Sequence, residues 1–261
     1  MLICNCKKQR ALRYFIEIMY DGGSYHGWQL QPGQQSVQQA LELSLLYKAG
    51  LQSHVTGCGR TDAGVSARQF FAHFDLPQVP DKKADQLVAE LNRFLPPDIT
   101  VRRIFAVPDD AHARFDATRR TYKYYICFRK NPFVRHHAWI YTAPLDIDMM
   151  NEAAANLLQY SDFTSFAKLH TDTKTNICHL HEASWEIHDD LLVFTITADR
   201  FLRNMVRAIV GTLVDIGRGK INPDAIHRII ESQNRSQAGM SVPAQGLFLE
   251  RVEYNHPWMP E

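Results

Sequence analysis

The sequence predicts an α+β protein with a mostly antiparallel sheet and helices on one side of it. Stretches with the period of a strand alternate with stretches of helical period along the chain. The order of these stretches is similar in two successive halves of the 261 residues. In the second half, strand patterns at 182–188 and 191–197 are separated by a short turn. This spacing indicates a hairpin and therefore antiparallel pairing.

The first half begins with a strand pattern at 14–20. A helix follows Ser36, which has Gln39 three residues later as in a capping box, and Val37, Leu41 and Leu45 form its apolar line. The remaining elements expected in this half are strands at 54–58, 68–75 and 99–106, and a helix at 82–93 that ends before Pro96 and Pro97.

The second half repeats this alternation of strands and helices. Its expected elements are a strand at 120–128, a helix at 146–158, the hairpin, helices at 201–217 and 223–232, and a strand at 246–252. The boundary between the halves is placed at Val107 and Pro108, which divides the chain into 1–107 and 108–261.

Composition indicates a compact globular protein. Apolar residues make up 45% of the chain, enough for a large core, and the net charge is only +1. No apolar run is long enough to span a bilayer, and the N-terminus lacks the apolar core of a signal peptide. We therefore expect a cytoplasmic protein without a membrane partner. Its five cysteines are an odd number and fit reduced thiols.

One region carries a local excess of positive charge. Between His112 and His137 there are seven Lys or Arg residues but only one acid, Asp116. Tyrosines are interleaved with these charges, and basic and aromatic side chains together are typical of RNA-binding strands. A solvated strand whose alternate residues enter the core explains the same pattern.

Residues 57–65 form a glycine-rich turn around a single carboxylate, that of Asp62. Arg60 lies two residues earlier and could keep Asp62 ionised. The glycine spacing fits neither a dinucleotide fingerprint nor a phosphate-binding loop. The turn is therefore either a site that exposes a reactive acid or an ordinary structural turn.

The helix expected at 201–217 has a strongly apolar stripe and must lie against the core. Arg200, Arg203 and Arg207 are spaced so that they share one flank of this helix. At least one of them could be half-buried and point inward. For Arg207, the favoured interpretation is an exposed helix arginine.

Eight motifs are spread over nearly the whole chain. They are YDG at 20–22 with GWQ at 27–29, SVQ at 36–38, GRTDAGV at 59–65, HARF at 112–115, RTYKY at 120–124, DFTSF at 162–166, FLRNMVR at 201–207 and GL at 246–247. In sequence and in order, these motifs resemble those of the tRNA pseudouridine synthase A family. The clearest departure is Ser66, where most members have histidine.

The resemblance implies the pseudouridine synthase fold, in which two similar halves share one sheet with an RNA-binding cleft between them. It also implies a homodimer that isomerises uridine to pseudouridine at positions 38 to 40 of the tRNA anticodon stem-loop. The reaction involves no redox change, so we expect no cofactor, and the spacings of cysteine and histidine predict no metal site.

The resemblance further suggests roles for individual residues. Asp62 would be the nucleophile, attacking C6 of the base or C1′ of the sugar, or would stabilise the separated sugar. Arg203 would pair with it, and Arg60 is a second candidate partner. Tyr122 would pack on the flipped base and Leu247 would line the base pocket, although both also suit a strand core. The residues expected to bind RNA phosphates are Arg119, Arg120 and Lys123.

Two other functions remain open at this point. A non-catalytic RNA-binding protein would keep the basic strand without needing Asp62. A nucleoside glycosidase would use a carboxylate, but typically with a second one as the acid.

Overall fold

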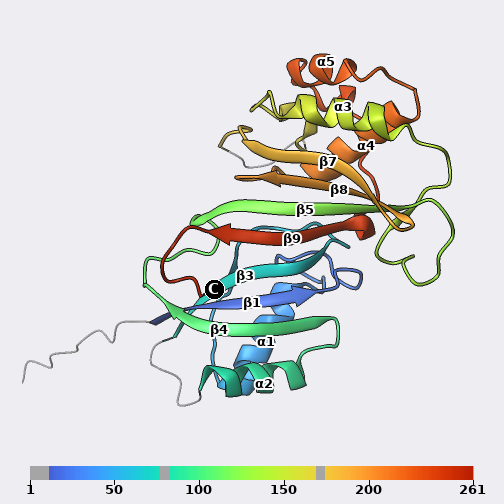
Figure 1. Ribbon diagram of the computed structural model, residues 1–261. Coiled ribbons are helices and arrows are strands. Elements are labelled where there is room, and N and C mark those ends of the chain that lie inside the picture. Colours follow the sequence, from blue (N-terminus) through green and yellow to red (C-terminus); the bar gives the residue numbers. More distant parts are fainter. Residues whose placement is uncertain (1–11, 77–82, 169–173, 261) are drawn as a thin grey trace, which may run out of the picture.

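The computed structural model describes residues 12–76, 83–168 and 174–260. Its strands form one sheet in the order β4-β1-β3-β9-β5-β8-β7, with β2 added beside β3 and β6 beside β5. Figure 1 shows α3, α4 and α5 at the β7 end of this sheet and α1 and α2 at the β4 end. All pairings are antiparallel except β3 with β9 and β5 with β6. The predicted α+β class with a mostly antiparallel sheet is confirmed.

The elements lie close to their predicted places. The first half contains β1 (Leu12–Tyr20), α1 (Val37–Ala49), β2 (Thr56–Gly57), β3 (Ser66–Leu76), α2 (Ala84–Phe94) and β4 (Ile99–Val107). The second half contains β5 (Ala117–Cys127), β6 (Trp139–Ile140), α3 (Ile147–Leu157), β7 (Leu180–His188), β8 (Leu191–Ala198), α4 (Met205–Gly217), α5 (Ala225–Glu231) and β9 (Leu247–Tyr254).

The two halves have the same topology. In the first, the spatial order β4-β1-β3-β2 is made from strands separated by α1 and α2. In the second, β9-β5-β8-β7 repeats this order with α3 and α4 in the corresponding connections. The boundary at residues 107 and 108 stays a prediction.

The halves meet where β3 pairs in parallel with β9, through Ser66 opposite Phe248 and Ala67 opposite Leu249. Two separate apolar cores lie on either side of this junction. Leu249 and Val252 of β9 belong to the core of the first half, whereas Leu247 belongs to that of the second. The last strand therefore stabilises both halves.

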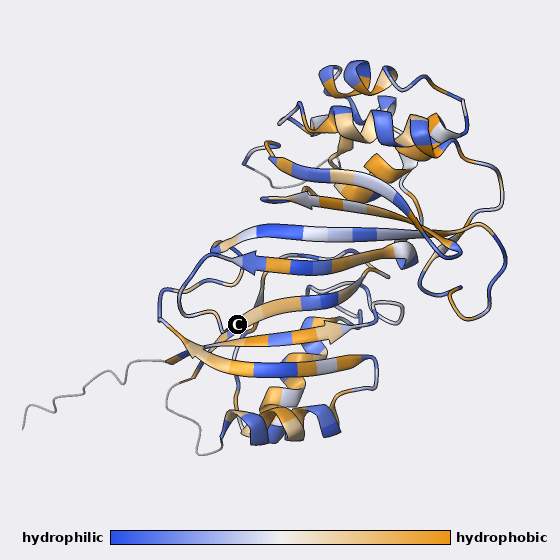
Figure 2. Cartoon of the chain, in the orientation of Figure 1, coloured by the Kyte–Doolittle hydropathy of each residue, from blue (hydrophilic) through white to orange (hydrophobic). Residues whose placement is uncertain are grey.

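Both predicted helix patterns are confirmed. The side chain of Ser36 accepts the backbone N–H of Gln39 at 3.2 Å and caps α1. Val37, Leu41 and Leu45 are fully buried in the first core. The stripe of α4 is likewise buried in the second core, next to α3. In Figure 2, the central strand β5 is coloured mainly blue and white, as expected from its many charged and polar residues.

Two predicted boundaries were wrong. The strand expected at 54–58 is reduced to β2, because the backbone N–H of Val55 binds the Glu42 carboxylate at 2.9 Å instead of a neighbouring strand. The helix expected from residue 201 starts only at Met205, because Asn204 has a left-handed backbone, with φ of 66°. Arg200 and Arg203 therefore precede the helix.

Within the described ranges, no helix is long and apolar enough to cross a membrane. Cys58, Cys127 and Cys178 are buried free thiols, while Cys4 and Cys6 lie outside the described residues.

Helix α4 packs against the segment 239–242 so closely that glycine is required where they touch. A Cβ atom on Gly211 would lie 1.8 Å from the carbonyl oxygen of Met240. We expect Gly211→Ala to lower the free energy of unfolding by about 1–3 kcal/mol, even though alanine alone favours a helix by about 1 kcal/mol over glycine. Urea unfolding followed by circular dichroism measures this.

Gly59→Ala is the matched control, since a Cβ atom there meets nothing within 4 Å. It should change the unfolding free energy by less than about 0.5 kcal/mol. Equal effects of the two substitutions would contradict the close approach of α4.

Candidate active site

The chain between β2 and β3, which we call the Asp62 turn (residues 58–65), presents one carboxylate. Its tip is a β-turn in which the N–H of Val65 donates to the carbonyl of Asp62 at 3.1 Å. Gly64 takes the third position with φ of 79°, which a side chain would strain. This turn directs the chain into β3 and leaves the Asp62 side chain 24% exposed.

The 20–29 loop holds the Asp62 turn from behind. Trp28 donates its N–H to the carbonyl of Thr61 at 3.3 Å, and Gly64 donates to that of Tyr25 at 3.2 Å. The hydroxyl groups of Tyr20 and Thr61 are hydrogen-bonded at 2.9 Å, and both side chains are buried. Residue 61 is thus fixed by backbone and side chain immediately before Asp62.

Glycine is required where the two loops touch. Gly27 has φ of 87°, and a Cβ atom there would lie 2.3 Å from the carbonyl oxygen of Thr61. A Cβ atom on Gly22 would lie 2.1 Å from the carbonyl oxygen of Val65. These approaches explain the glycines of the YDG and GWQ motifs physically.

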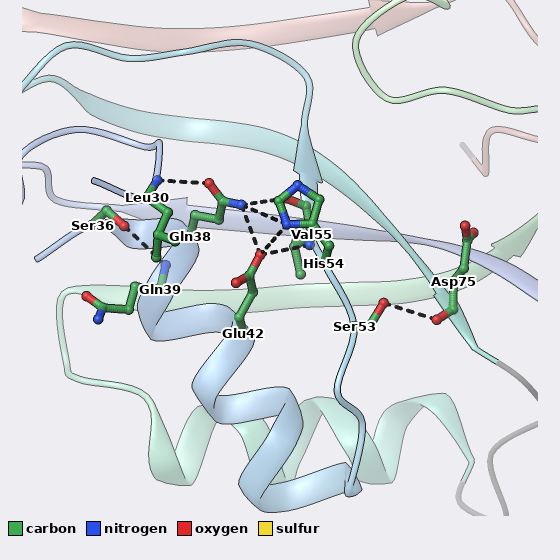
Figure 3. A network of polar contacts seen from close by, with 9 residues as sticks. All are labelled: Leu30, Ser36, Gln38, Gln39, Glu42, Ser53, His54, Val55 and Asp75. Carbon is green, nitrogen blue, oxygen red and sulfur yellow. Dashed lines mark hydrogen bonds and ion pairs between the residues drawn. The ribbon is translucent and has the colours of Figure 1, made fainter. Parts of the chain in front are cut away.

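Gln38 ties the 20–29 loop to the strand that enters the turn (Figure 3). Its side-chain oxygen accepts the N–H of Leu30 at 2.9 Å, while its amide nitrogen donates to the Val55 carbonyl at 3.1 Å and to Glu42 at 2.9 Å. Gln38 is buried, so each of these bonds replaces water. The SVQ motif therefore supports the position of the turn.

Ser66 occupies the position at which the family usually has histidine. It is buried, and its Oγ accepts the backbone N–H of Gly22 at 3.0 Å. In this chain residue 66 braces the 20–29 loop through this hydrogen bond.

The Asp62 carboxylate faces two guanidinium groups from the second half. Nε of Arg203 lies 3.5 Å from Oδ1, and Nη1 of Arg207 lies 3.9 Å from Oδ2. Arg207 is further held by a 2.7 Å hydrogen bond from its Nε to the carbonyl of Val242. The carboxylate and its counter-charges therefore come from different halves of the chain.

The sequence-based interpretation of Arg207 was wrong. Arg207 is half-buried, with 20% of its side chain exposed, instead of an exposed helix residue. Arg203 is the more exposed of the two, at 57%. Arg60 is also exposed, and among the described residues it forms no ion pair with Asp62. The misplaced helix start explains the error, because Arg203 and Arg207 do not share a helical flank.

Tyr122 on β5 lies next to this group. Its ring packs edge-on against Phe201, with centroids 5.1 Å apart. Burial, and after it the nearby Cys58, raises the pKa of the Tyr122 hydroxyl; Arg120 lowers it, and Asp62 raises it by less. The hydroxyl therefore keeps its proton at neutral pH. Burial also raises the pKa of the Cys58 thiol to about 11, which excludes a thiolate nucleophile at the base of the turn.

Leu247 starts β9 opposite Tyr124 and is 5% exposed in the second core. Its neighbour Gly246 lies against the Tyr124 ring, where a Cβ atom would come within 2.8 Å. The structure thus places Leu247 at the junction of the halves, within packed apolar surroundings.

The three basic residues of β5 do not lie together. Regular pairing with β8 keeps the alternation of side chains along β5, so Arg120 and Tyr122 share one side. Arg119 and Lys123 point to the opposite side. The guanidinium of Arg120 is directed at backbone carbonyls, including that of Cys58 at 3.1 Å.

A polar cavity of about 570 Å³ opens beside the Asp62 turn. Gly64, Arg135, His136 and Gln245 are among its lining residues, so the turn, the basic region and the segment before β9 meet there. Within residues 12–76, 83–168 and 174–260, no cluster of three or more His, Cys, Asp or Glu side chains could hold a metal ion.

Comparison with known proteins identifies the family of this chain. Residues 153–255 match the family model described as tRNA pseudouridine synthase. The tRNA pseudouridine synthase A of Bacteroides fragilis is 55% identical over 93% of this chain and 96% of its own length. Those of Parabacteroides distasonis and Bacillus subtilis are 50% and 39% identical, over 95% and 94% of this chain and 98% and 100% of their own lengths. The chain belongs to the tRNA pseudouridine synthase A family.

Proposed function

We propose that this tRNA pseudouridine synthase uses Asp62 as its nucleophile and modifies uridine at positions 38 to 40 of the anticodon stem-loop. The observation that carries the proposal is the meeting of the two halves at one carboxylate. Asp62 is presented by a braced turn of the first half, and two arginines of the second half lie within 4 Å of it.

The chemistry requires an ionised carboxylate next to the target nucleotide. The N-glycosidic bond must break, the uracil must turn, and a bond from C1′ to C5 must form, with no net change in atoms or oxidation state. Asp62 attacks C6 or C1′, or stabilises the separated sugar. Arg207 and Arg203 hold the orientation of the Asp62 carboxylate.

Tyr122 and Leu247 would receive the flipped uracil. A base must leave its stack to reach an acid in a cleft, and an aromatic ring provides a surface on which it can pack. Because its pKa is raised, the Tyr122 hydroxyl would act as a hydrogen-bond donor or relay a proton from C5, and would not act as a phenolate base. Arg119 and Lys123, on the other side of β5, would contact more distant phosphates of the tRNA.

The homodimer and the cytoplasmic location are further proposals from the family resemblance. A nucleoside glycosidase would release free uracil, and a purely RNA-binding protein would leave uridine unchanged. Both alternatives are thus separated from the proposed function by the products of the reaction.

We expect Asp62→Asn to abolish turnover, because the amide keeps the shape of the turn but removes the nucleophile. Binding of tRNA should stay near the wild-type level. Position-resolved pseudouridine maps of tRNA from cells lacking the protein, complemented with either form, provide the measurement. Only wild type should restore the modification at positions 38 to 40.

Asp224→Asn is the control for this experiment, since Asp224 is exposed at the start of α5. Restoration by Asp62→Asn would sink the nucleophile assignment. If the mutant no longer bound tRNA, Asp62 would be a structural residue.

Arg207→Ala should reduce the single-turnover rate by about 100-fold, the effect of a catalytic group displaced by about 1 Å. Arg207 is half-buried and anchored by Val242, so its removal leaves Asp62 without a fixed counter-charge. Arg203 is mostly exposed, and exposed ion pairs are worth no more than about 1 kcal/mol. Arg203→Ala should therefore have a clearly smaller effect. A larger fall in rate with Arg203→Ala would reverse the ranking.

Tyr122→Phe keeps the ring but deletes the hydroxyl. We expect tRNA affinity to change little, because base packing survives. A fall of about 10²–10⁴-fold in the single-turnover rate would be the signature of proton transfer. Tyr122→Leu, which removes the ring, should weaken binding in addition. Equal affinities for the two variants would argue against packing of the base on Tyr122.

A further inference from the structure

The guanidinium group of Arg120 binds four backbone carbonyls. Nη1 donates to Ala117 at 2.9 Å and Asp199 at 2.7 Å, and Nη2 donates to Cys58 at 3.1 Å and Arg114 at 2.6 Å. Three of these carbonyls belong to segments far apart in the sequence: the Asp62 turn, the connection before β5 and the connection before α4. Arg120 therefore fastens three loops to one point.

Each fastened loop carries another arginine close to its bonded carbonyl. Arg60 follows Cys58 by two residues, Arg114 supplies its own carbonyl, and Arg200 follows Asp199 directly. Arg60 and Arg114 are exposed and Arg200 is half-buried. Burial, and after it the positive charges of Arg60, Arg120 and Arg200, lower the pKa of Arg114. The carbonyls of Asp199, Cys58 and Arg114 surround one guanidinium group, so the backbones that carry the three arginines also lie close together.

The acids nearest to this cluster are engaged elsewhere. The Asp199 carboxylate accepts the backbone N–H and the Nδ1 of His179, at 2.8 and 2.9 Å, and the backbone N–H of Arg200 at 2.7 Å. That of Asp116 accepts the backbone N–H of His112 at 2.7 Å. Among the residues that the structure describes, Arg60, Arg114 and Arg200 form no ion pair with a carboxylate.

We propose that Arg60, Arg114 and Arg200 together bind one backbone phosphate of the RNA beside the target uridine, and that Arg120 is the positioning residue that assembles this site. The proposal rests on the proposed function. Three guanidinium groups without an internal counter-charge are repelled by one another and stabilised by a phosphodiester, which accepts bidentate hydrogen bonds from them.

The location suits base flipping. Arg60 is separated from Asp62 by a single residue, so the phosphate would be held next to the reacting nucleotide. Extruding a base rotates its backbone and costs a few kcal/mol of stacking and pairing. A phosphate contact beside that nucleotide would stabilise the rotated conformation of the backbone.

The first test measures binding of an anticodon stem-loop RNA in the Asp62→Asn background, where no turnover interferes. For the triple variant Arg60→Ala/Arg114→Ala/Arg200→Ala, which can no longer neutralise the one phosphate, the slope of log Kd against log salt should become shallower by about 0.7–0.9. Arg218→Ala, which removes a charge at the far end of α4, is the control and should keep the slope. An unchanged slope for the triple variant would overturn the proposal.

The second test identifies the phosphate. Stem-loops are made with a single uncharged methylphosphonate linkage at each position within two nucleotides of the target. At one linkage, Arg114→Ala should weaken binding no further, because the charge that it contacts is already absent. If Arg114→Ala weakened the binding of every substituted RNA by the factor seen with native RNA, Arg114 would contact none of the phosphates tested, and the proposed site would be wrong.

The third test addresses Arg120. Arg120→Lys keeps the charge but cannot hold four carbonyls, so it should show the shallower slope of the triple variant. A wild-type slope would mean that Arg120 does not assemble the site. None of these binding tests measures turnover. If one of them failed, wild type would still be expected to modify uridine and Asp62→Asn would not, so the proposed function would stand without the phosphate site.

Discussion

The short parallel pairing of β3 with β9 is the interaction on which the site depends. It consists of only two residue pairs, Ser66 with Phe248 and Ala67 with Leu249. Ser66 follows the Asp62 turn directly, and Leu247 directly precedes Phe248. A shift of one residue would turn each side chain to the other side of the sheet. The pairing therefore aligns the turn of one half with the arginines of the other.

The turn itself has little regular structure, and its shape is imposed by its surroundings. The 20–29 loop exchanges backbone hydrogen bonds with the turn, and Gln38 ties that loop to Val55, just before β2. Arg120, on β5, holds the Cys58 carbonyl. Buried backbone groups need partners, so removing any of these supports would leave a polar group unsatisfied. A reactive acid can be presented on an irregular loop because the scaffold around it is rigid.

Much of this arrangement was predictable from the sequence, because hydrophobic period and capping are local properties. The cap at Ser36 and the buried stripe of α4 are examples. The start of α4 was not predictable in this way. Asn204 adopts its left-handed backbone in a tertiary setting, where its side chain donates to Ser241 and the carbonyl of Arg203 accepts the Lys168 N–H. The relative burial of Arg203 and Arg207 depends on that start.

The basic residues of β5 show the same limit. Positive charge along β5 was visible in the sequence, but the bonds of Arg120 to carbonyls of three loops depend on contacts between residues far apart in the chain.

The place of β9 in the chain has a consequence for biosynthesis. The first half lacks Leu249 and Val252 of its own core until the last described strand has been made. The two halves therefore cannot close on each other before β9 has left the ribosome. Until then the Asp62 turn and the two arginines that face its carboxylate belong to parts of the chain that are not yet joined.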